Sequence, residues 1–224
     1  MYDFLVNCSN WKEENIKLLL DKNATKDKIH DAINWLDDKE DENDVILIFY
    51  TSHGWKTKLT EKKYGHAVIF TYNVTEENKI EDKITDKEFD AWVDELESEN
   101  IAIILESCYS GKMLSLRQKG RVLLAAGGKN FFCGVDDSDF LKFGIFSHYI
   151  IEGFSGVADL NNDGWVAAEE VFRYARLHTV YTSIWEQFPF VQKYGDRLIF
   201  WSFQVPHMYD WYRGSLPLVQ LPED

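Results

Sequence analysis

Short, almost fully apolar runs of strand length recur along this chain and limit its possible folds more than any other feature. They are VILIFY (45–50), IAIIL (101–105) and RVLLAA (121–126). Such runs predict strands that are covered on both faces, because a strand with one solvated face alternates apolar and polar residues. Amphipathic helical patterns lie between them. This alternation indicates an α/β domain with a mostly parallel central sheet and helices on both faces.

Helix-capping signals and apolar periodicity place further elements around these strands. Thr25 is expected to cap a helix over about 26–37, and Thr85 with Glu88 forms the capping-box pattern of another helix. The remaining expected elements are a strand at 66–72, helices around 144–153 and 167–184, and a strand around 196–202.

The 224-residue chain has the length of one large domain, and no Pro/Gly/Ser-rich linker divides it. All four prolines lie at or beyond position 189. We therefore expect one compact domain over residues 1–200 and an irregular, aromatic-rich tail over 201–224.

Charge and composition exclude several classes of function. The chain has 38 acidic and 24 basic residues, a net charge of −14, which disfavours nucleic-acid binding and favours basic peptides or metal cations as partners. No apolar run reaches transmembrane length and no signal-peptide pattern is visible, so we expect no membrane contact, while the compartment and the oligomeric state stay open. Three cysteines exclude a disulfide framework and a four-cysteine zinc site, and they leave room for a reactive thiol.

A histidine and a cysteine follow two of the predicted buried strands. VILIFY is followed by Thr51-Ser52-His53-Gly54, and IAIIL is followed by Glu106-Ser107-Cys108. Ligands bind at the carboxyl ends of strands in parallel sheets, so both side chains are expected at one edge. A thiol needs a base or an imidazolium nearby to react at neutral pH, and a glycine lets backbone N–H groups approach a substrate carbonyl. The pair therefore predicts nucleophilic catalysis by a Cys–His dyad.

The blocks FYTSHG and ILESCYSG resemble the two signature blocks of caspase-like (clan CD) cysteine peptidases. They are most similar to the metacaspase, legumain and prokaryotic caspase-like types, and AAGGKNFFCGVDD also resembles the legumain segment after the nucleophile. The resemblance covers about residues 14–200 and implies a caspase-like three-layer sandwich. Family members begin with a strand and a helix before a segment like NWKEENIKLLL (10–20), so we expect the family's first strand to be missing here.

The resemblance also implies a role for each matching residue. Cys108 would attack the scissile carbonyl, His53 would protonate the leaving amine, and the backbone N–H groups of Gly54 and Cys108 would form the oxyanion hole.

Acidic residues near the nucleophile predict the substrate. Glu106 lies two residues before Cys108, and a carboxylate buried there is costly unless a cation pairs with it. Asp136 matches the second acid of the legumain pocket, and Asp137 is the alternative. We therefore expect cleavage of peptides or proteins after Arg or Lys.

A calcium-loop pattern lies between the two last expected helices. Residues 159–170 read DLNNDGWVAAEE and fit the twelve-residue pattern of a calcium-binding loop, in which oxygen atoms surround the ion. The ligands would be Asp159, Asn161, Asp163, the carbonyl of Trp165 and a bidentate Glu170. The sequence thus predicts one structural Ca²⁺, against the alternative of an Asx-rich turn that caps the next helix.

Other functions remain open at the level of sequence. One is a legumain-like peptidase or ligase specific for Asn, or an acyl transferase that uses the same Cys–His pair. Another is a calcium-stabilised interaction module in which the enzyme site has decayed.

Overall fold

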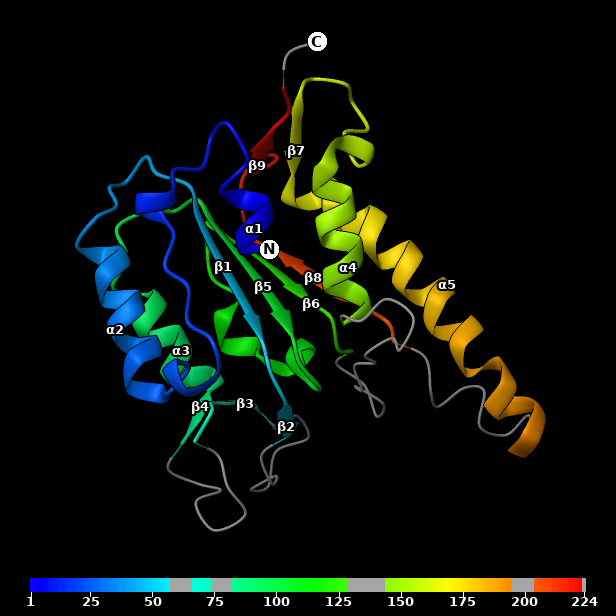
Figure 1. The fold of residues 1–224 in the computed structure, drawn as a ribbon. Coiled ribbons are helices and arrows are strands. Elements are labelled where there is room, and N and C mark those ends of the chain that lie inside the picture. The colour runs from blue at the N-terminus through cyan, green and yellow to red at the C-terminus, as the bar shows by residue number, and fades with distance from the viewer. Residues whose placement is uncertain (57–65, 74–81, 129–143, 195–203, 223–224) are drawn as a thin grey trace.

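The computed structural model is built around one central sheet (Figure 1). It describes residues 1–56, 66–73, 82–128, 144–194 and 204–222. The sheet contains β1 (Ile46–Thr51), β5 (Ile101–Glu106), β6 (Arg121–Ala125) and β8 (His207–Asp210), in the order β1-β5-β6-β8. The first three strands are parallel and β8 is antiparallel to β6. The three apolar runs are therefore neighbouring strands of a mostly parallel sheet, as predicted.

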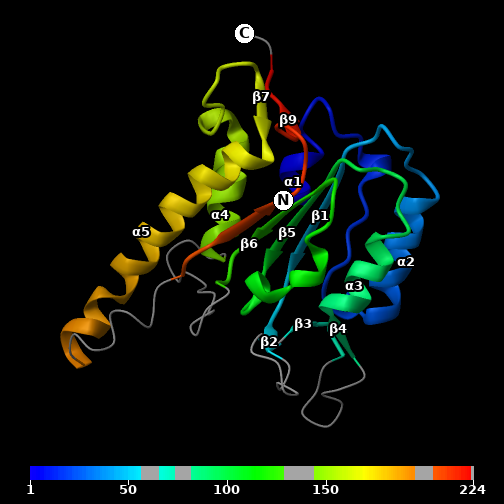
Figure 2. The same cartoon turned by 180° about the vertical axis from the view of Figure 1, so that it is seen from behind.

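Helices cover both faces of this sheet (Figures 1 and 2). The helices are α1 (Tyr2–Leu5), α2 (Lys26–Asp37), α3 (Asp86–Val93), α4 (Ile145–Glu152) and α5 (Ala168–Tyr194). Along β5, Ile103 and Leu105 pack in the cluster of α2 and α3, whereas Ala102 and Ile104 pack in the cluster of α4 and α5. Since successive side chains point to opposite faces of a strand, β5 needs apolar residues at every position. The α/β three-layer arrangement is confirmed.

Both predicted caps are present. The side chain of Thr25 accepts a hydrogen bond from the backbone of Lys28 at 3.4 Å, at the start of α2. Thr85 and Glu88 form a reciprocal capping box at the start of α3, in which Glu88 N–H donates to Thr85 Oγ1 at 3.2 Å. These caps satisfy backbone donors that the first turn of a helix leaves unpaired.

Two small antiparallel sheets flank the central one. The first joins β2 (Gly54–Lys56), β3 (Ala67–Phe70) and β4 (Lys83–Thr85). The second joins β7 (Trp165–Ala167) to β9 (Pro217–Gln220). Short 3₁₀ turns over Glu13–Asn15, Asp21–Asn23, Ser110–Lys112 and Leu114–Leu116, and a π turn over Gly153–Val157, complete the described elements.

The C-terminal residues are not an irregular tail, and that prediction was wrong for β8 and β9. Residues of β8 pair with β6 from Val122↔Asp210 to Ala125↔His207. In β9, Leu218 and Val219 are buried beneath α4 and α5. Proline does not prevent this pairing, because Pro217 is the first residue of its strand. The strand expected around 196–202 lies outside the described residues.

Helix α5 is longer than the helix predicted over 167–184. It continues through Pro189 and ends at Tyr194. A proline removes one helical hydrogen bond and kinks a helix without always ending it. In the described part of the chain, no helix is both long and apolar enough to cross a membrane.

Candidate active site

The ends of β1 and β5 bring the predicted histidine and cysteine to one edge of the sheet. Thr51 pairs with Glu106, and the Ser52 N–H donates to the Glu106 carbonyl at 3.1 Å. His53 and Cys108 each lie two residues beyond this last pair. Adjacent parallel strands thus deliver both residues side by side, as the sequence predicts.

Gly54 joins the two strand-end loops. A β-carbon at this position would overlap the carbonyl oxygen of Cys108 and lie 3.0 Å from Ser107 Oγ. No residue with a side chain fits there without moving backbone. The histidine loop therefore packs directly on the backbone of the cysteine loop.

The backbone of His53 is fixed while its side chain is exposed. Its carbonyl accepts one hydrogen bond from the Phe70 N–H at 2.9 Å and another from the Ser52 hydroxyl at 2.8 Å. β2 begins at the next residue and pairs with β3. An exposed imidazole on a fixed backbone can exchange protons with a substrate and with water.

Cys108 is a half-buried free thiol in a tight turn. The next residue, Tyr109, has the left-handed backbone conformation with φ 63°, and the 3₁₀ turn Ser110–Lys112 follows. The hydroxyl of Ser107, buried beside Gly54, has no hydrogen-bond partner within the described ranges. This turn presents the thiol at the edge of the sheet.

A residue just after β6 and another on β8 hold the cysteine loop in place. The Gly127 N–H donates to Ser110 Oγ at 2.8 Å, and the Gly111 N–H donates to the Gly127 carbonyl at 3.0 Å. The hydroxyl of Tyr209, on β8, donates to the Gly111 carbonyl at 2.9 Å. Sequence reasoning missed Ser110 and Tyr209, since nothing local in the sequence indicates contacts between such distant positions.

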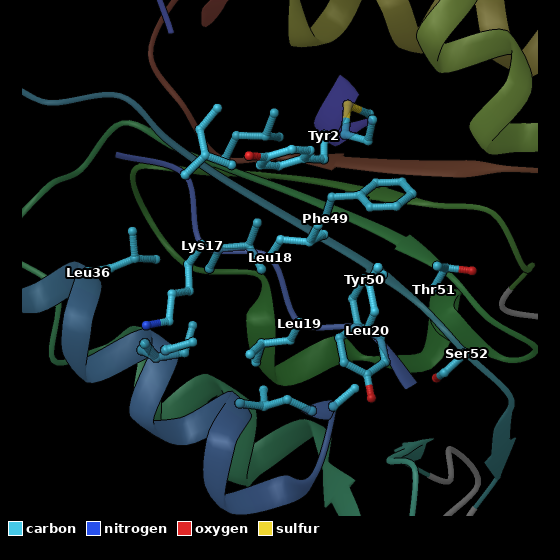
Figure 3. A pocket seen from close by; sticks show the side chains of 18 of the residues that line it. Tyr2, Lys17, Leu18, Leu19, Leu20, Leu36, Phe49, Tyr50, Thr51 and Ser52 are labelled. Carbon is cyan, nitrogen blue, oxygen red and sulfur yellow. The ribbon is translucent and has the colours of Figure 1, made fainter. Parts of the chain in front are cut away.

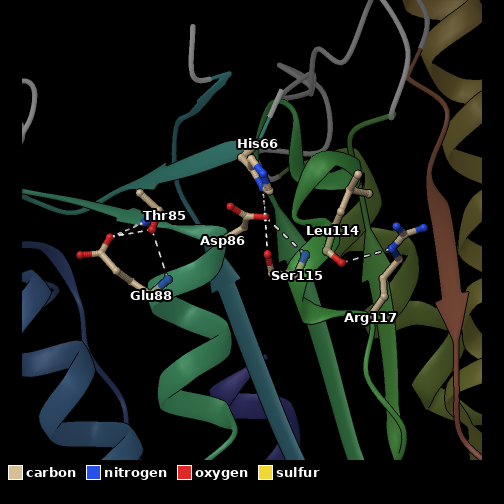
Figure 4. A network of polar contacts seen from close by, with 7 residues as sticks. All are labelled: His66, Thr85, Asp86, Glu88, Leu114, Ser115 and Arg117. Carbon is tan, nitrogen blue, oxygen red and sulfur yellow. Dashed lines mark hydrogen bonds and ion pairs between the residues drawn. The ribbon is translucent and has the colours of Figure 1, made fainter. Parts of the chain in front are cut away.

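A buried carboxylate anchors the turn that follows the cysteine loop (Figure 4). Asp86, at the start of α3, accepts hydrogen bonds from the Ser115 hydroxyl at 2.8 Å and from the Ser115 N–H at 3.3 Å. The same oxygen lies 2.7 Å from Nδ1 of His66, and Asp86 is fully buried. This network ties the start of α3 and the residue before β3 to the 3₁₀ turn Leu114–Leu116.

Two aromatic rings lie on the residues that follow His53–Gly54 and Cys108. The rings of Trp55 and Tyr109 meet edge to face with centroids 5.9 Å apart, and Trp55 is more than half exposed. The ammonium groups of Lys56 and Lys112 lie 5.9 and 5.5 Å from the centre of the Tyr109 ring. Cation–π contacts of this kind hold the ring against the loop.

Glu106 has protein partners that sequence reasoning did not foresee. Its side chain is buried, and it accepts hydrogen bonds from the backbone N–H groups of Phe146 at 3.2 Å and Ser147 at 2.8 Å. These donors belong to the first turn of α4, where the helix dipole also favours a negative charge. A β-carbon at Gly144 would overlap the carboxylate. The helix N-terminus therefore offsets the cost of burying this charge without a substrate cation. Asp136 and Asp137 lie outside the described residues.

The predicted calcium loop folds as a tight turn between the π turn and α5. Gly164 has φ +82°, and its N–H donates to Asp159 at 3.1 Å. Glu170 accepts from the N–H groups of Leu160 at 3.2 Å and Ala167 at 3.1 Å. Trp165 begins β7, and its N–H donates to Asp163, whose side chain also contacts Asn161. These oxygens are the hard donors that Ca²⁺ prefers, so the residues suit the ion in kind. Across the described ranges, however, no three His, Cys, Asp or Glu side chains are grouped closely enough to hold a metal.

Comparisons with known proteins show the family and the fold. No significant match was found among curated proteins. Among solved structures, the chain is similar to protein GSU0716 from Geobacter sulfurreducens, with a TM-score of 0.56 and 12% sequence identity over 92% of this chain and 83% of that chain. A likeness at this identity shows the fold alone. The family model for the metacaspase, peptidase C14 domain matches residues 1–117, which include His53 and Cys108. That match covers more than half of the chain, which therefore belongs to the metacaspase family of cysteine-type peptidases.

Proposed function

We propose that this chain is a cysteine endopeptidase that cleaves peptide bonds after Arg or Lys by a Cys108–His53 dyad. The observation that carries the proposal is the contact of Gly54 with the Cys108 backbone, which places the two strand-end loops against each other. A family assignment alone would give only the general class of cysteine peptidase.

The mechanism follows from the residues at this edge. The Cys108 thiol gives its proton to His53, and the sulfur attacks the carbonyl carbon of the scissile bond to form a tetrahedral oxyanion. The N–H groups of Gly54 and Cys108 are the proposed donors to that oxyanion. As the carbon–nitrogen bond breaks, His53 gives a proton to the leaving amine. The neutral His53 then accepts a proton from the water that attacks the thioester, the carbon–sulfur bond breaks, and His53 returns that proton to the Cys108 sulfur, which restores the free thiol.

The preference for a basic residue is supported by charge near the nucleophile. Glu106 lies two residues before Cys108, and its buried carboxylate supplies a negative charge close to the proposed nucleophile. The chain's net charge of −14 also attracts cationic substrates. Asp136 or Asp137 is the proposed second acid of the pocket.

Specificity is tested with four fluorogenic peptides that differ only in the residue before the scissile bond: Arg, Lys, Asn or Asp. We expect kcat/KM to be at least about 100-fold higher for Arg and Lys than for Asn, because an unpaired charge in the pocket costs a few kcal/mol. Asp136→Asn and Asp137→Asn, compared side by side, identify which acid contributes. A preference for Asn would replace the proposal with a legumain-like specificity, and a preference for Asp would refute an acidic pocket.

We also propose that Asp159, Asn161, Asp163, the Trp165 carbonyl and Glu170 bind one structural Ca²⁺. The turn at Gly164 and the oxygen-only donor set support this. When bound, the ion would neutralise the loop's carboxylates and link the start of α5 to the turn before it. Titration calorimetry with Ca²⁺ measures binding to this site directly. The absence of a heat of binding would contradict the proposed calcium site.

A further inference from the structure

The antiparallel ladder between β2 and β3 extends one residue beyond β2, to the candidate catalytic histidine. β2 and β3 pair from Gly54↔Ile69 onward. The Phe70 N–H donates to the His53 carbonyl at 2.9 Å, which continues that register by one pair. Successive side chains of a strand point to opposite faces. His53 and Trp55 therefore share one face of this ribbon.

The other face of β2 packs on the cysteine loop. A β-carbon on Gly54 would overlap the carbonyl oxygen of the proposed nucleophile, and the Lys56 ammonium lies 5.9 Å from the centre of the Tyr109 ring. Trp55 lies between these two residues of β2, yet its indole also reaches Tyr109, with ring centroids 5.9 Å apart. The indole thus extends from the His53 face of β2 to the residue that follows the nucleophile.

The side chain of Trp55 is exposed although its backbone is fixed. Trp55 is 56% exposed. It pairs with Val68, and Val68 and the neighbouring Ile69 are buried on β3. Tryptophan provides a large apolar contact area and loses little conformational freedom when a ligand covers it. This ring therefore offers apolar area to a ligand that reaches the adjacent imidazole.

A second surface adjoins His53 on the side of β1. A cavity of about 880 Å³ lies beside this strand, and His53 is one of its lining residues. Figure 3 shows Tyr50, Thr51 and Ser52 following one another along β1 at this cavity. Trp55 does not line it. A substrate residue beside His53 thus has two places available, which mutations can distinguish.

We propose that Trp55, backed by Tyr109, binds the side chain of the substrate residue directly after the scissile bond and selects a large apolar residue there. The inference rests on the proposed function, because it uses the role of His53 as the proton donor to the leaving amine. That amine belongs to the residue after the scissile bond, so its side chain begins next to the imidazole. Trp55 is the next residue along β2 on the same face. A large apolar side chain on this indole removes apolar area of both partners from water.

Two cations near the rings define the rival preference. The ammonium groups of Lys56 and Lys112 lie 5.9 and 5.5 Å from the centre of the Tyr109 ring. Like charges repel, so these groups disfavour a basic residue after the scissile bond. The face of the Tyr109 ring already attracts both ammonium groups, which leaves the exposed indole as the main contact for substrate. An acidic residue is the alternative that the experiment has to distinguish.

The first experiment measures kcat/KM for internally quenched peptides that differ only in the residue after the scissile bond: Phe, Leu, Gly, Asp or Lys. The residue before the bond is whichever of Arg, Lys, Asn or Asp is cleaved fastest, so that the specificity at that position does not affect the comparison. We expect kcat/KM for Phe and Leu to be at least about tenfold above that for Gly, and Lys to give the lowest value. The highest value for Asp, or equal values for all five, would overturn the proposal.

Variants of the chain locate the bound side chain. Trp55→Ala should reduce the ratio of kcat/KM between the Phe and Gly peptides to about twofold or less. A merely structural loss would lower both values equally and keep the ratio, which would overturn the proposal. Leu20→Ala probes the cavity beside β1. A ratio that is lost in Leu20→Ala but kept in Trp55→Ala would place the side chain in that cavity and would also overturn the proposal.

Trp211→Ala is the matched control for Trp55→Ala. Trp211 is 60% exposed, and its N–H donates to the Arg121 carbonyl at 3.0 Å. Arg121 is the first residue of β6 and pairs with the first residue of β5, whereas Cys108 follows the other end of β5. The control therefore removes an equally exposed indole at the opposite edge of the sheet, and it should keep the ratio.

Binding without turnover separates this inference from the proposed function. In Cys108→Ala, fluorescence anisotropy gives Kd for labelled Phe and Gly peptides, with Arg before the bond if no peptide is cleaved by the unchanged chain. We expect Kd to be at least about fivefold lower for the Phe peptide, and this difference to be lost when Trp55→Ala is added. If the difference is present but the unchanged chain cleaves nothing, the proposed peptidase fails and the apolar subsite remains. Equal or undetectable binding of the two peptides would overturn the subsite, whatever the turnover.

Discussion

Gly54 packs against the carbonyl oxygen of Cys108 so closely that a β-carbon at position 54 would overlap that atom. The contact joins the loop after β1 to the loop after β5 through backbone alone. The separation of the His53 and Cys108 loops is therefore set by two strand ends and one missing side chain, and it should be sensitive to a single methyl group.

The first prediction concerns that methyl group. Gly54→Ala should lower kcat/KM on the order of 100-fold, because displacing a reactive group by about 1 Å has effects of that size. The overlap with backbone should also cost about 1–3 kcal/mol of stability. Activity and thermal melting of the variant measure both effects. Thr51→Ala, an exposed change at the end of β1, is the control and should alter neither. Full activity in Gly54→Ala would mean that the two loops are not in contact.

The second prediction separates two roles of Glu106. Its two carboxylate oxygens accept from Phe146 and Ser147, so Glu106→Gln should lose one of these bonds and about 1–3 kcal/mol of stability even without substrate. Chemical denaturation measures this loss, with the exposed Glu14→Gln as the matched control. If Glu106 served only to bind a basic substrate residue, both variants would unfold at the same denaturant concentration.

The third prediction compares a buried with an exposed carboxylate. Asp86→Ala should cost about 2 kcal/mol or more, since it removes the partner of Ser115 and of His66 from a buried position. Glu99→Ala removes an ion pair with Lys119 in which both side chains are more than half exposed, and it should cost less than about 1 kcal/mol. Equal costs in urea unfolding would show that the Asp86 network is not structural.

The fourth prediction concerns calcium. An ion bound only by the folded state, at about a hundredfold above its dissociation constant, should add roughly 2.7 kcal/mol of stability. Chelation should lower Tm, and Glu170→Gln should lower it in the presence of Ca²⁺, because a bidentate carboxylate becomes a neutral amide. The exposed Glu95→Gln is the control. Melting curves that do not respond to calcium or chelator would leave residues 159–170 as a turn without a metal.

The parallel sheet and the position of His53 and Cys108 at one edge of it could be predicted from the sequence, because each depends on a local signal. A buried strand is recognised from its own apolar residues. The residues that follow its carboxyl end then lie at the corresponding edge of the sheet. The caps at Thr25 and Thr85 are also local. Such features require no knowledge of distant contacts.

The features that were missed all depend on contacts between distant positions. β8 was not foreseen, because HMYD has little apolar character of its own and pairs only through β6. Glu106 was expected to need a substrate cation, but the first turn of α4 supplies its donors from 40 positions away. Asp86 resembles an ordinary acid in the first turn of a helix, and only the tertiary structure buries it.

The central claim is that Cys108 is the nucleophile, and kcat/KM of Cys108→Ala with an Arg fluorogenic peptide tests it most directly. Cys8→Ala is the matched control. Burial raises the pKa of the Cys8 thiol, and its Sγ–H donates to the Phe4 carbonyl at 3.4 Å, so we do not expect Cys8 to act as a nucleophile. The account predicts that Cys108→Ala melts like the unchanged chain but has no turnover above background, whereas Cys8→Ala stays active. Turnover retained in a pure preparation of Cys108→Ala would contradict it.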